Sequence, residues 1–83
     1  MQLTLHTDNG HGWLFVSNTA LNDLGLARES FSQYSFHDTS GVYAEEDRDA
    51  GIVLNAMECR GYAPNCIECH LEGEHWIRQL PRC

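Results

Sequence analysis

Short stretches of alternating apolar and polar residues recur along this chain, and a period of two is typical of β-strands. Residues 2–6 alternate in this way, and the turn-forming sequence TDNGHG separates them from the apolar run WLFV at 13–16. Residues 34–37 alternate again, and DTSG leads from them into 42–45. The pattern predicts a hairpin, or a strand that leads into a helix, in the first part of the chain, and a clear hairpin in the second.

Between these two parts, apolar residues repeat at the spacing of a helix. Ser17 or Asn18 can cap this helix at its start, and Gly25 indicates an early end. We expect two to three turns, with an apolar face formed by Ala20, Leu21, Leu24 and Leu26.

A longer helix is expected after the second hairpin. Asp47 or Asp49 can cap its start, and Gly61 stands where a C-terminal cap belongs. Its shared apolar face consists of Ile52, Val53, Ala56 and Met57.

The end of the chain alternates once more, over 66–72 and over 75–80, and Gly73 with Glu74 can form a two-residue turn between these strands. The predicted order of elements is β(β)αββαββ. Helices interleaved with antiparallel hairpins favour an α+β fold of two layers, in which two helices cover a mainly antiparallel sheet of four to six strands.

A chain of 83 residues without a Pro-, Gly- or Ser-rich linker is expected to form a single domain over 1–83. Domains of this size bury a modest share of their surface, and many gain stability from a metal, from disulfides or from a second subunit. A homodimer is therefore an open alternative.

Acidic residues dominate the charge of the chain. Twelve Asp and Glu oppose five basic residues, all of them arginine, and the formal net charge is −7 at pH 7. Nucleic-acid binders draw most of their affinity from Lys and Arg on phosphates, so direct binding of nucleic acid is not expected. The same charge suits a protein partner with a basic surface, although negative charge also keeps small proteins soluble.

The starting sequence MQLTLHTDNGHGWLF lacks the basic segment and the apolar core of a signal peptide, and no run approaches the roughly 20 apolar residues of a membrane span. We therefore expect the protein in the cytoplasm, without a membrane partner. Thiols are usually reduced there, so the cysteines are expected to be free thiols or metal ligands.

The sequence CIECH at 66–70 contains the Cys-x-x-Cys spacing of zinc sites and of haem attachment. Residues three apart on a strand point to opposite faces, so Cys66 and Cys69 are not expected to share a metal, and no cofactor is expected. Covalent haem is disfavoured because its attachment needs export. The alternative is structural zinc held by Cys59, Cys66, Cys69 and either His70 or Cys83.

Four carboxylates cluster where the second helix should begin: Glu45, Glu46, Asp47 and Asp49. The exposed N–H groups of a helix start favour negative charge by about 0.3–1 kcal/mol per carboxylate, so capping alone can explain the cluster. In a functional interpretation, the same carboxylates form a negative ridge, together with Glu29 and Asp38, that docks on an arginine-rich protein surface.

None of the usual catalytic motifs is present in the sequence: there is no G-x-S-x-G, H-E-x-x-H, P-loop or G-x-G-x-x-G pattern. The five histidines are scattered along the predicted strands and turns. The stretch NGHGW has the composition of a plain turn, and its backbone N–H groups could alternatively surround an anion. An enzyme is not expected.

Four segments carry a resemblance that spans nearly the whole chain: GHGWLFV at 10–16, SQYSF at 32–36, VYAEEDRDAG at 42–51 and WIRQLP at 76–81. They resemble a set of small proteins encoded by phages, plasmids and other mobile elements, whose pattern is GHGWL, then YS[YF], then YLEEDxDA, with an arginine near the end. This chain has Ala44 where that pattern has Leu, and CIECH falls outside the shared segments. The resemblance implies proteins that block host defence by binding.

The sequence thus favours a small acidic interaction protein of phage or mobile-element origin. It is expected to inhibit a host defence or nucleic-acid-handling complex, in the manner of anti-CRISPR or anti-restriction proteins. The residues expected to contact the partner are Glu45, Glu46, Asp47 and Asp49, with Trp13 and Tyr43 as apolar neighbours. Two alternatives remain: the zinc-stabilised binding module, and an oligomeric nucleotide-binding sponge whose pockets are lined by His11, Trp13 and Arg78.

Overall fold

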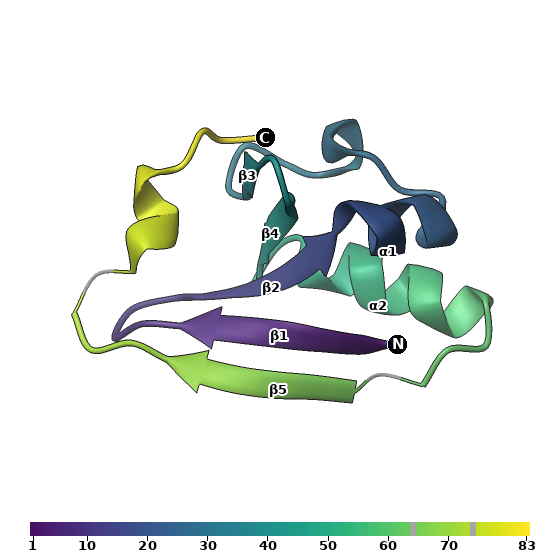
Figure 1. The fold of residues 1–83 in the computed structure, drawn as a ribbon, viewed down its shortest axis with the longest axis horizontal. Coiled ribbons are helices and arrows are strands. Elements are labelled where there is room, and N and C mark those ends of the chain that lie inside the picture. The colour runs from purple at the N-terminus through teal and green to yellow at the C-terminus, as the bar shows by residue number, and fades with distance from the viewer. Residues whose placement is uncertain (64, 74) are drawn as a thin grey trace.

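The fold is α+β, as predicted, with five strands in one open and mostly antiparallel sheet (Figure 1). A computed structural model describes residues 1–63, 65–73 and 75–83. Two short 3-10 helices, η1 and η2, accompany two α-helices. The elements in chain order are β1 (Gln2–Thr7), β2 (Gly12–Ser17), α1 (Asn18–Leu24), η1 (Arg28–Ser30), β3 (Phe36–Asp38), β4 (Gly41–Glu45), α2 (Ala50–Cys59), β5 (Asn65–His70) and η2 (Trp76–Gln79).

The strands follow the order β3-β4-β2-β1-β5 across the sheet. Three of the four pairings are antiparallel: β1 with β2, β2 with β4, and β3 with β4. The fourth pairs β1 with β5 in parallel, with Leu3 opposite Cys66 and Thr7 opposite His70. The first and the last strand of the chain are therefore neighbours.

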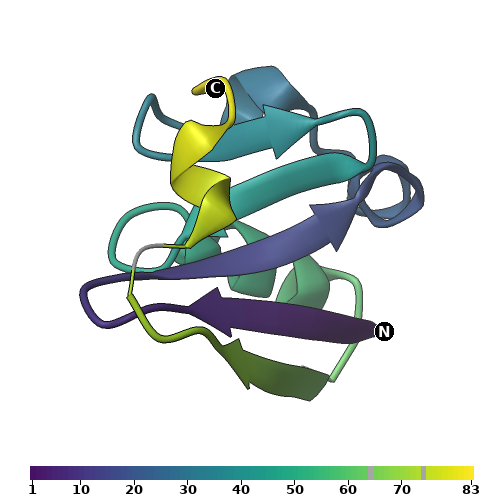
Figure 2. The same ribbon diagram turned by 60° about the vertical axis from the view of Figure 1, so that its left-hand side comes forward.

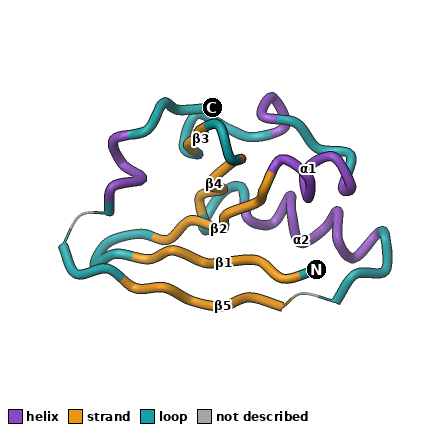
Figure 3. The backbone as a smooth tube through the Cα atoms, in the orientation of Figure 1, coloured by secondary structure: helices purple, strands orange, loops and turns teal. Residues whose placement is uncertain are grey.

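The main core lies between the sheet and the two α-helices, which cover one face (Figures 1 and 3). Alternate residues of the strands point into it, as the period of two predicts. The sheet contributes Leu3, Leu14, Val16, Val42 and Ala44, and the helices contribute Ala20, Leu21, Leu24, Ala50, Val53 and Met57.

A second, smaller core occupies the opposite face of the sheet. The C-terminal η2 lies across this face (Figure 2), and its Ile77 is fully buried. Ile77 packs there with Trp13, Phe36 and Tyr43. The central strands β2 and β4 are consequently covered on both faces.

The ends of α1 are formed as the sequence predicts. Ser17 is the N-cap, and its hydroxyl accepts a hydrogen bond from the N–H of Ala20 at 3.2 Å. Gly25 follows the helix with φ of 68°, a left-handed conformation that costs a residue with a Cβ considerably more than glycine. The helix consequently ends after seven residues.

The start of α2 differs from the expected carboxylate capping. Asp49 occupies the N-cap position, but its side chain makes no capping hydrogen bond. Its carboxylate instead accepts from the N–H and the hydroxyl of Ser32, both at 2.8 Å, and from the hydroxyl of Ser35. The acidic residue therefore fixes the loop before β3 rather than the helix.

The predicted last hairpin is wrong. The strand expected at 66–72 exists as β5, but the segment expected as its partner at 75–80 forms η2, and β5 pairs with β1. Two contacts hold this segment in η2: the His75 ring accepts from the N–H of Ile77, and Asp8, from the distant β1–β2 turn, accepts from the backbone N–H of His75. Of the predicted turn at Gly73 and Glu74, Glu74 lies outside the described residues.

Candidate functional site

An open cleft of about 480 Å³ lies beside the second core, at the end of the sheet where the β1–β2 turn and the β4–α2 turn meet. We name it the arginine cleft. Three arginines, three aromatic residues, two carboxylates and one histidine line it: Arg48, Arg78, Arg82, Trp13, Tyr34, Phe36, Glu45, Asp47 and His11.

Each arginine of the cleft lies over an aromatic ring. The Cζ atom of Arg48 is 4.4 Å from the centre of the Tyr34 ring, that of Arg78 is 5.2 Å from Trp13, and that of Arg82 is 5.1 Å from Phe36. Distances below about 6 Å allow the cation to interact with the face of the ring. Stacking of this kind orients the plane of a guanidinium group. Nη1 of Arg82 also donates to the carbonyl of Gln33 at 3.1 Å.

Arg78 is fixed in addition by a buried carboxylate. Its Nε atom donates to Oδ2 of Asp8 at 2.8 Å, and its Nη2 atom donates to Oδ1 at 3.1 Å. The Asp8 side chain is 1% exposed. It also accepts from the backbone N–H groups of Gly10, His11 and His75, at 2.9, 2.9 and 3.0 Å. Arg78 foremost, and then these N–H groups, hold the pKa of Asp8 well below its usual range.

The N–H groups of the NGHGW turn therefore surround an anion that belongs to the chain itself. Gly10 and His11 direct their N–H groups at Asp8, which begins the turn. The turn is thereby tied to η2, and His11 is placed at the cleft.

Two further buried carboxylates, Glu45 and Asp49, belong to a hydrogen-bond network that stabilises the loop before β3. Ser35 is fully buried, and its hydroxyl donates to Asp49 and accepts from the N–H of Glu45 at 3.0 Å. Oε2 of Glu45 in turn accepts from the N–H of Asp47 at 3.0 Å. This network fixes the backbone that carries Tyr34 and Arg48 into the cleft.

Three potential ligand atoms converge at the cleft. Nδ1 of His11 lies 3.8 Å from Oε1 of Glu45. One ligand atom each from His11, Glu45 and Asp47 lie within 4.8 Å of one another, and imidazole with two carboxylates is a donor set that divalent cations accept. The same three groups serve equally well as hydrogen-bond partners of a polar ligand.

His75 and His6 lie together beneath η2. Their ring centres are 5.3 Å apart, and desolvation lowers the pKa of both, with the neighbouring His75 lowering that of His6 further. Tyr43 lies beside His6, at 6.0 Å between ring centres, and burial raises its pKa. These rings are structural neighbours of the cleft and are absent from its lining.

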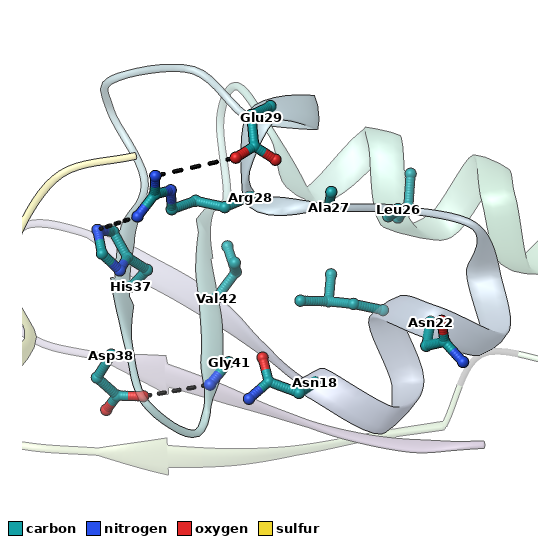
Figure 4. Close-up of a pocket in the computed structure, with 11 residues that line it drawn as sticks. Asn18, Asn22, Leu26, Ala27, Arg28, Glu29, His37, Asp38, Gly41 and Val42 are labelled. Atoms are coloured by element: carbon teal, nitrogen blue, oxygen red, sulfur yellow. Dashed lines mark hydrogen bonds and ion pairs between the residues drawn. The ribbon is translucent and has the colours of Figure 1, made fainter.

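A second hollow of about 380 Å³ opens between α1, η1 and the β3–β4 hairpin (Figure 4). Its polar groups already contact each other: Arg28 lies 3.4 Å from Nε2 of His37 and 3.9 Å from Glu29. The Asp38 carboxylate accepts from the N–H of Gly41 at 3.2 Å and from the Tyr43 hydroxyl at 2.8 Å. This hollow is therefore a weaker candidate than the arginine cleft.

The residues predicted to contact a partner do not form one exposed ridge. Glu45 and Asp49 are buried, as are the two aromatic residues Trp13 and Tyr43. Glu46 and Asp47 are the exposed members of the set. Partner binding by this set stays a prediction, now resting on two side chains.

The four cysteines are free thiols. Cys66 and Cys69 lie on β5 with the predicted alternation, Cys59 ends α2 and Cys83 is half-buried at the C-terminus. Within the described part of the chain, no group of three potential ligands includes a cysteine or His70. The arrangement predicted for zinc is thus not assembled in this structure.

Sequence reasoning placed His11, Trp13 and Arg78 together but missed most of the cleft. Arg48, Arg82, Tyr34 and Phe36 come from three segments that only the fold brings together. The signal that could have indicated Asp8 is the DNG turn, because Asp at the start of such a turn often accepts backbone hydrogen bonds.

None of the helices within the described residues combines the length and the apolar composition that crossing a membrane requires. A scan against protein-family models found no match to this chain, and searches among curated proteins and among solved structures also found none.

Proposed function

We propose that this protein binds a small ligand with a flat, polar ring and an anionic group, the chemistry of a nucleotide, in the arginine cleft. The observation that carries the proposal is the convergence of three of the five arginines, each on an aromatic ring, in one cleft of a chain with net charge −7. Acidic proteins of this size do not need such a cluster for solubility.

The cleft offers groups that suit both parts of such a ligand. Arg48 and Arg82 are exposed, and guanidinium groups bind phosphate or carboxylate through paired N–H donors. Glu45 and Asp47 offer acceptors for the amino and imino groups of a base. A ligand with both features satisfies the cleft better than a simple anion, which the two carboxylates would repel.

The four segments that carry the resemblance to mobile-element proteins also supply eight of the nine residues that line the cleft, all except Arg82. His11 and Trp13 come from the first, Tyr34 and Phe36 from the second, Glu45, Asp47 and Arg48 from the third, and Arg78 from the fourth. This supports a role for the cleft in whatever those segments have in common. We propose binding without turnover, in keeping with the lack of a catalytic motif in the sequence.

The experiment is ligand binding by the full chain, purified without a tag. Calorimetry with mononucleotides, cyclic nucleotides and inorganic phosphate should give a dissociation constant for at least one nucleotide and markedly weaker binding of phosphate. Mass spectrometry of the supernatant after denaturation identifies a ligand that co-purifies. Absence of nucleotide binding up to millimolar concentration would overturn the proposal.

A matched pair of variants tests the site. Arg48→Gln with Arg82→Gln removes two charges from the cleft, and we expect affinity to fall by about tenfold to a hundredfold, since hydrogen bonds to charged groups contribute about 1.5–3 kcal/mol. Arg28→Gln with Arg60→Gln removes the same charge outside the cleft and should leave affinity within about twofold. Equal losses in both variants would indicate a general effect of charge.

The acidic interaction protein remains a second candidate because Glu46 and Asp47 are exposed side by side on the β4–α2 turn. In this proposal the turn contacts a basic surface of a host defence or nucleic-acid-handling complex. Glu46→Arg with Asp47→Arg should abolish a salt-sensitive association in a pull-down from host extract. Glu58→Arg with Glu72→Arg, at positions that are also exposed, is the matched control, and equal effects of both pairs would reject the proposal.

A further inference from the structure

The two edges of the sheet differ in whether other parts of the chain cover them. The edge at β3 is short and is closed by the C-terminal residues: the N–H of His37 donates to the carbonyl of Pro81 at 3.0 Å, and Phe36 forms an isolated bridge with Arg82. The edge at β5 is six residues long, and in the described part of the chain no strand pairs with its outer side (Figure 3).

The β5 edge has the features of a pairing surface. All six of its residues are exposed, and Ile67 and the adjoining Leu71 are 51% and 41% exposed. The N–H of Leu71 donates to the carbonyl of Thr7 at 2.9 Å, so the pairing with β1 continues through Leu71. A long exposed edge that carries apolar residues is a template for adding another strand.

The direction of the backbone groups follows from this hydrogen bond. Residues of a strand alternate in the side to which they direct N–H and C=O groups. Because Leu71 directs its N–H at β1, Cys69 and Ile67 do the same. The groups of Cys66, Glu68 and His70 therefore point outward from the sheet, where a further strand would bind.

We propose that β5 pairs antiparallel with β5 of a second copy of this chain, around a two-fold axis that passes beside Cys69. In this register, Glu68 lies opposite His70 of the second copy, and Ile67 lies opposite Leu71 of the second copy. The two sheets then continue into one another. The inference goes beyond ligand binding in the arginine cleft and does not depend on it.

Charge complementarity favours this register over the registers centred on Glu68 or on His70. Glu68 and His70 lie on the same face of β5, so each finds an oppositely charged or hydrogen-bonding partner across the interface. Nδ1 of His70 contacts the Thr7 hydroxyl at 2.8 Å, and its Nε2 atom lies 3.8 Å from Oε1 of the exposed Glu72 of the same chain. If the axis passed beside Glu68, this carboxylate would lie opposite Glu68 of the second copy. If it passed beside His70, Glu68 would lie opposite Glu72 of the second copy.

The backbone hydrogen-bonding pattern of β5 is compatible with the same register. The two Glu68–His70 pairs are hydrogen-bonded pairs, and each exchanges two N–H···O=C bonds. Cys69 and its symmetry mate form a non-hydrogen-bonded pair, with Cα atoms about 4.5 Å apart, which is within the range that a disulfide can bridge. On the same face, Ile67 and Leu71 of both copies cover one another.

Cross-linking tests the register directly. The variant with Cys59→Ser, Cys66→Ser and Cys83→Ser keeps Cys69 as its single cysteine. It should form a covalent dimer under mild oxidation. The matched variant that keeps Cys66 alone should not, because Cys66 lies on the opposite face and opposite Glu72 of the second copy. Cross-linking of the Cys66 variant in place of the Cys69 variant would overturn the proposal.

Sedimentation equilibrium of the unmodified, reduced chain tests the dimer itself. A two-fold dimer is expected, and Glu68→Arg should weaken it by about tenfold because each His70 then faces a hydrogen-bond donor in place of the Glu68 carboxylate. Adding His70→Glu to that variant should restore most of the affinity. A monomer at millimolar concentration, or a dimer that Glu68→Arg leaves unchanged while circular dichroism shows a folded variant, would contradict the inference.

Discussion

The guanidinium of Arg78 and the carboxylate of Asp8, 70 positions apart in the sequence, form a bidentate ion pair at 2.8 and 3.1 Å. This pair holds η2 against the β1–β2 turn, and it thereby closes the second core over Trp13 and Ile77. It also holds one of the three arginines of the cleft in place. Stability and the geometry of the candidate site therefore depend on the same contact.

Removing the charge of Asp8 should destabilise the fold strongly. Asp8→Asn leaves the Arg78 cation without its buried counter-charge, and breaking a buried pair in this way costs about 3–5 kcal/mol. Urea unfolding at pH 7 measures the loss. Asp23→Asn, at an exposed position of α1, should change the free energy of unfolding by less than about 0.5 kcal/mol. A loss for Asp8→Asn as small as that of the control would contradict the buried pair.

Stability should fall as the pH drops below about 6.5, the ordinary histidine pKa. The folded state lowers the pKa of His75 and of His6, so the unfolded chain binds these protons more tightly, and the stabilisation present above pH 6.5 is lost below it. Each histidine contributes a slope of at most about 1.4 kcal/mol per pH unit. Urea midpoints measured between pH 7.5 and 5.5 give the slope.

A variant at position 75 separates this effect from other titrations. The neutral His75 ring accepts from the N–H of Ile77 at 3.2 Å through Nδ1, which protonation would prevent. Asn is a good N-cap residue and offers an uncharged acceptor in a similar place. His75→Asn should therefore flatten the pH dependence, and an unchanged slope would assign the effect to other groups.

Loss of the Ser35 hydroxyl should cost more than an ordinary serine deletion. Ser35→Ala leaves the N–H of Glu45 without its acceptor and removes a donor from Asp49, and each buried group left unsatisfied costs about 1–3 kcal/mol. Thermal or urea unfolding measures the difference. Ser40→Ala, at an exposed position of the β3–β4 turn, is the control and should be nearly neutral. Equal effects of the two substitutions would argue against the Asp49 network.

The four thiols should react at two distinct rates. Cys59, Cys66 and Cys69 are exposed, whereas burial and the nearby Asp49 carboxylate raise the pKa of Cys83 to about 11. The thiolate is the reactive form, so at pH 8 Cys83 should react about a hundredfold more slowly with a disulfide reagent. Three thiols per chain should react in a fast phase and one in a slow phase. Cys83→Ser should remove the slow phase alone. Four equally fast thiols would place Cys83 at the surface.

Sequence patterns predicted the elements that local interactions decide. Ser17 as a cap, Gly25 as the end of α1 and the strand with Leu3 and Leu5 all depend on residues within one turn or one strand. The partner of β5 could not be predicted, because alternation over 66–72 is equally compatible with a hairpin and with a parallel neighbour. Asp8 decided the matter by holding the backbone of His75, 67 positions away.

The candidate site was predicted only in part, for a similar reason. A cluster of carboxylates in a sequence suggests a charged surface, yet Asp49 is buried because Ser32 and Ser35 fold back to donate to it. Arg48 and Arg82 join the cleft through Tyr34 and Phe36, whose rings lie next to them only after β3 and β4 have paired. Composition alone gives no sign of such convergence.

The parallel pairing of β1 with β5 also bears on how the chain folds while it is synthesised. When the first sixty residues have left the ribosome, β1 can pair with β2 on one side, but its other side stays without a neighbour until residues 65–71 emerge. Contacts between such distant segments form late and slowly. The outer edge of β1 is therefore unpaired in any partly folded chain that lacks β5, and the sheet is completed only when residues 65–71 dock against β1.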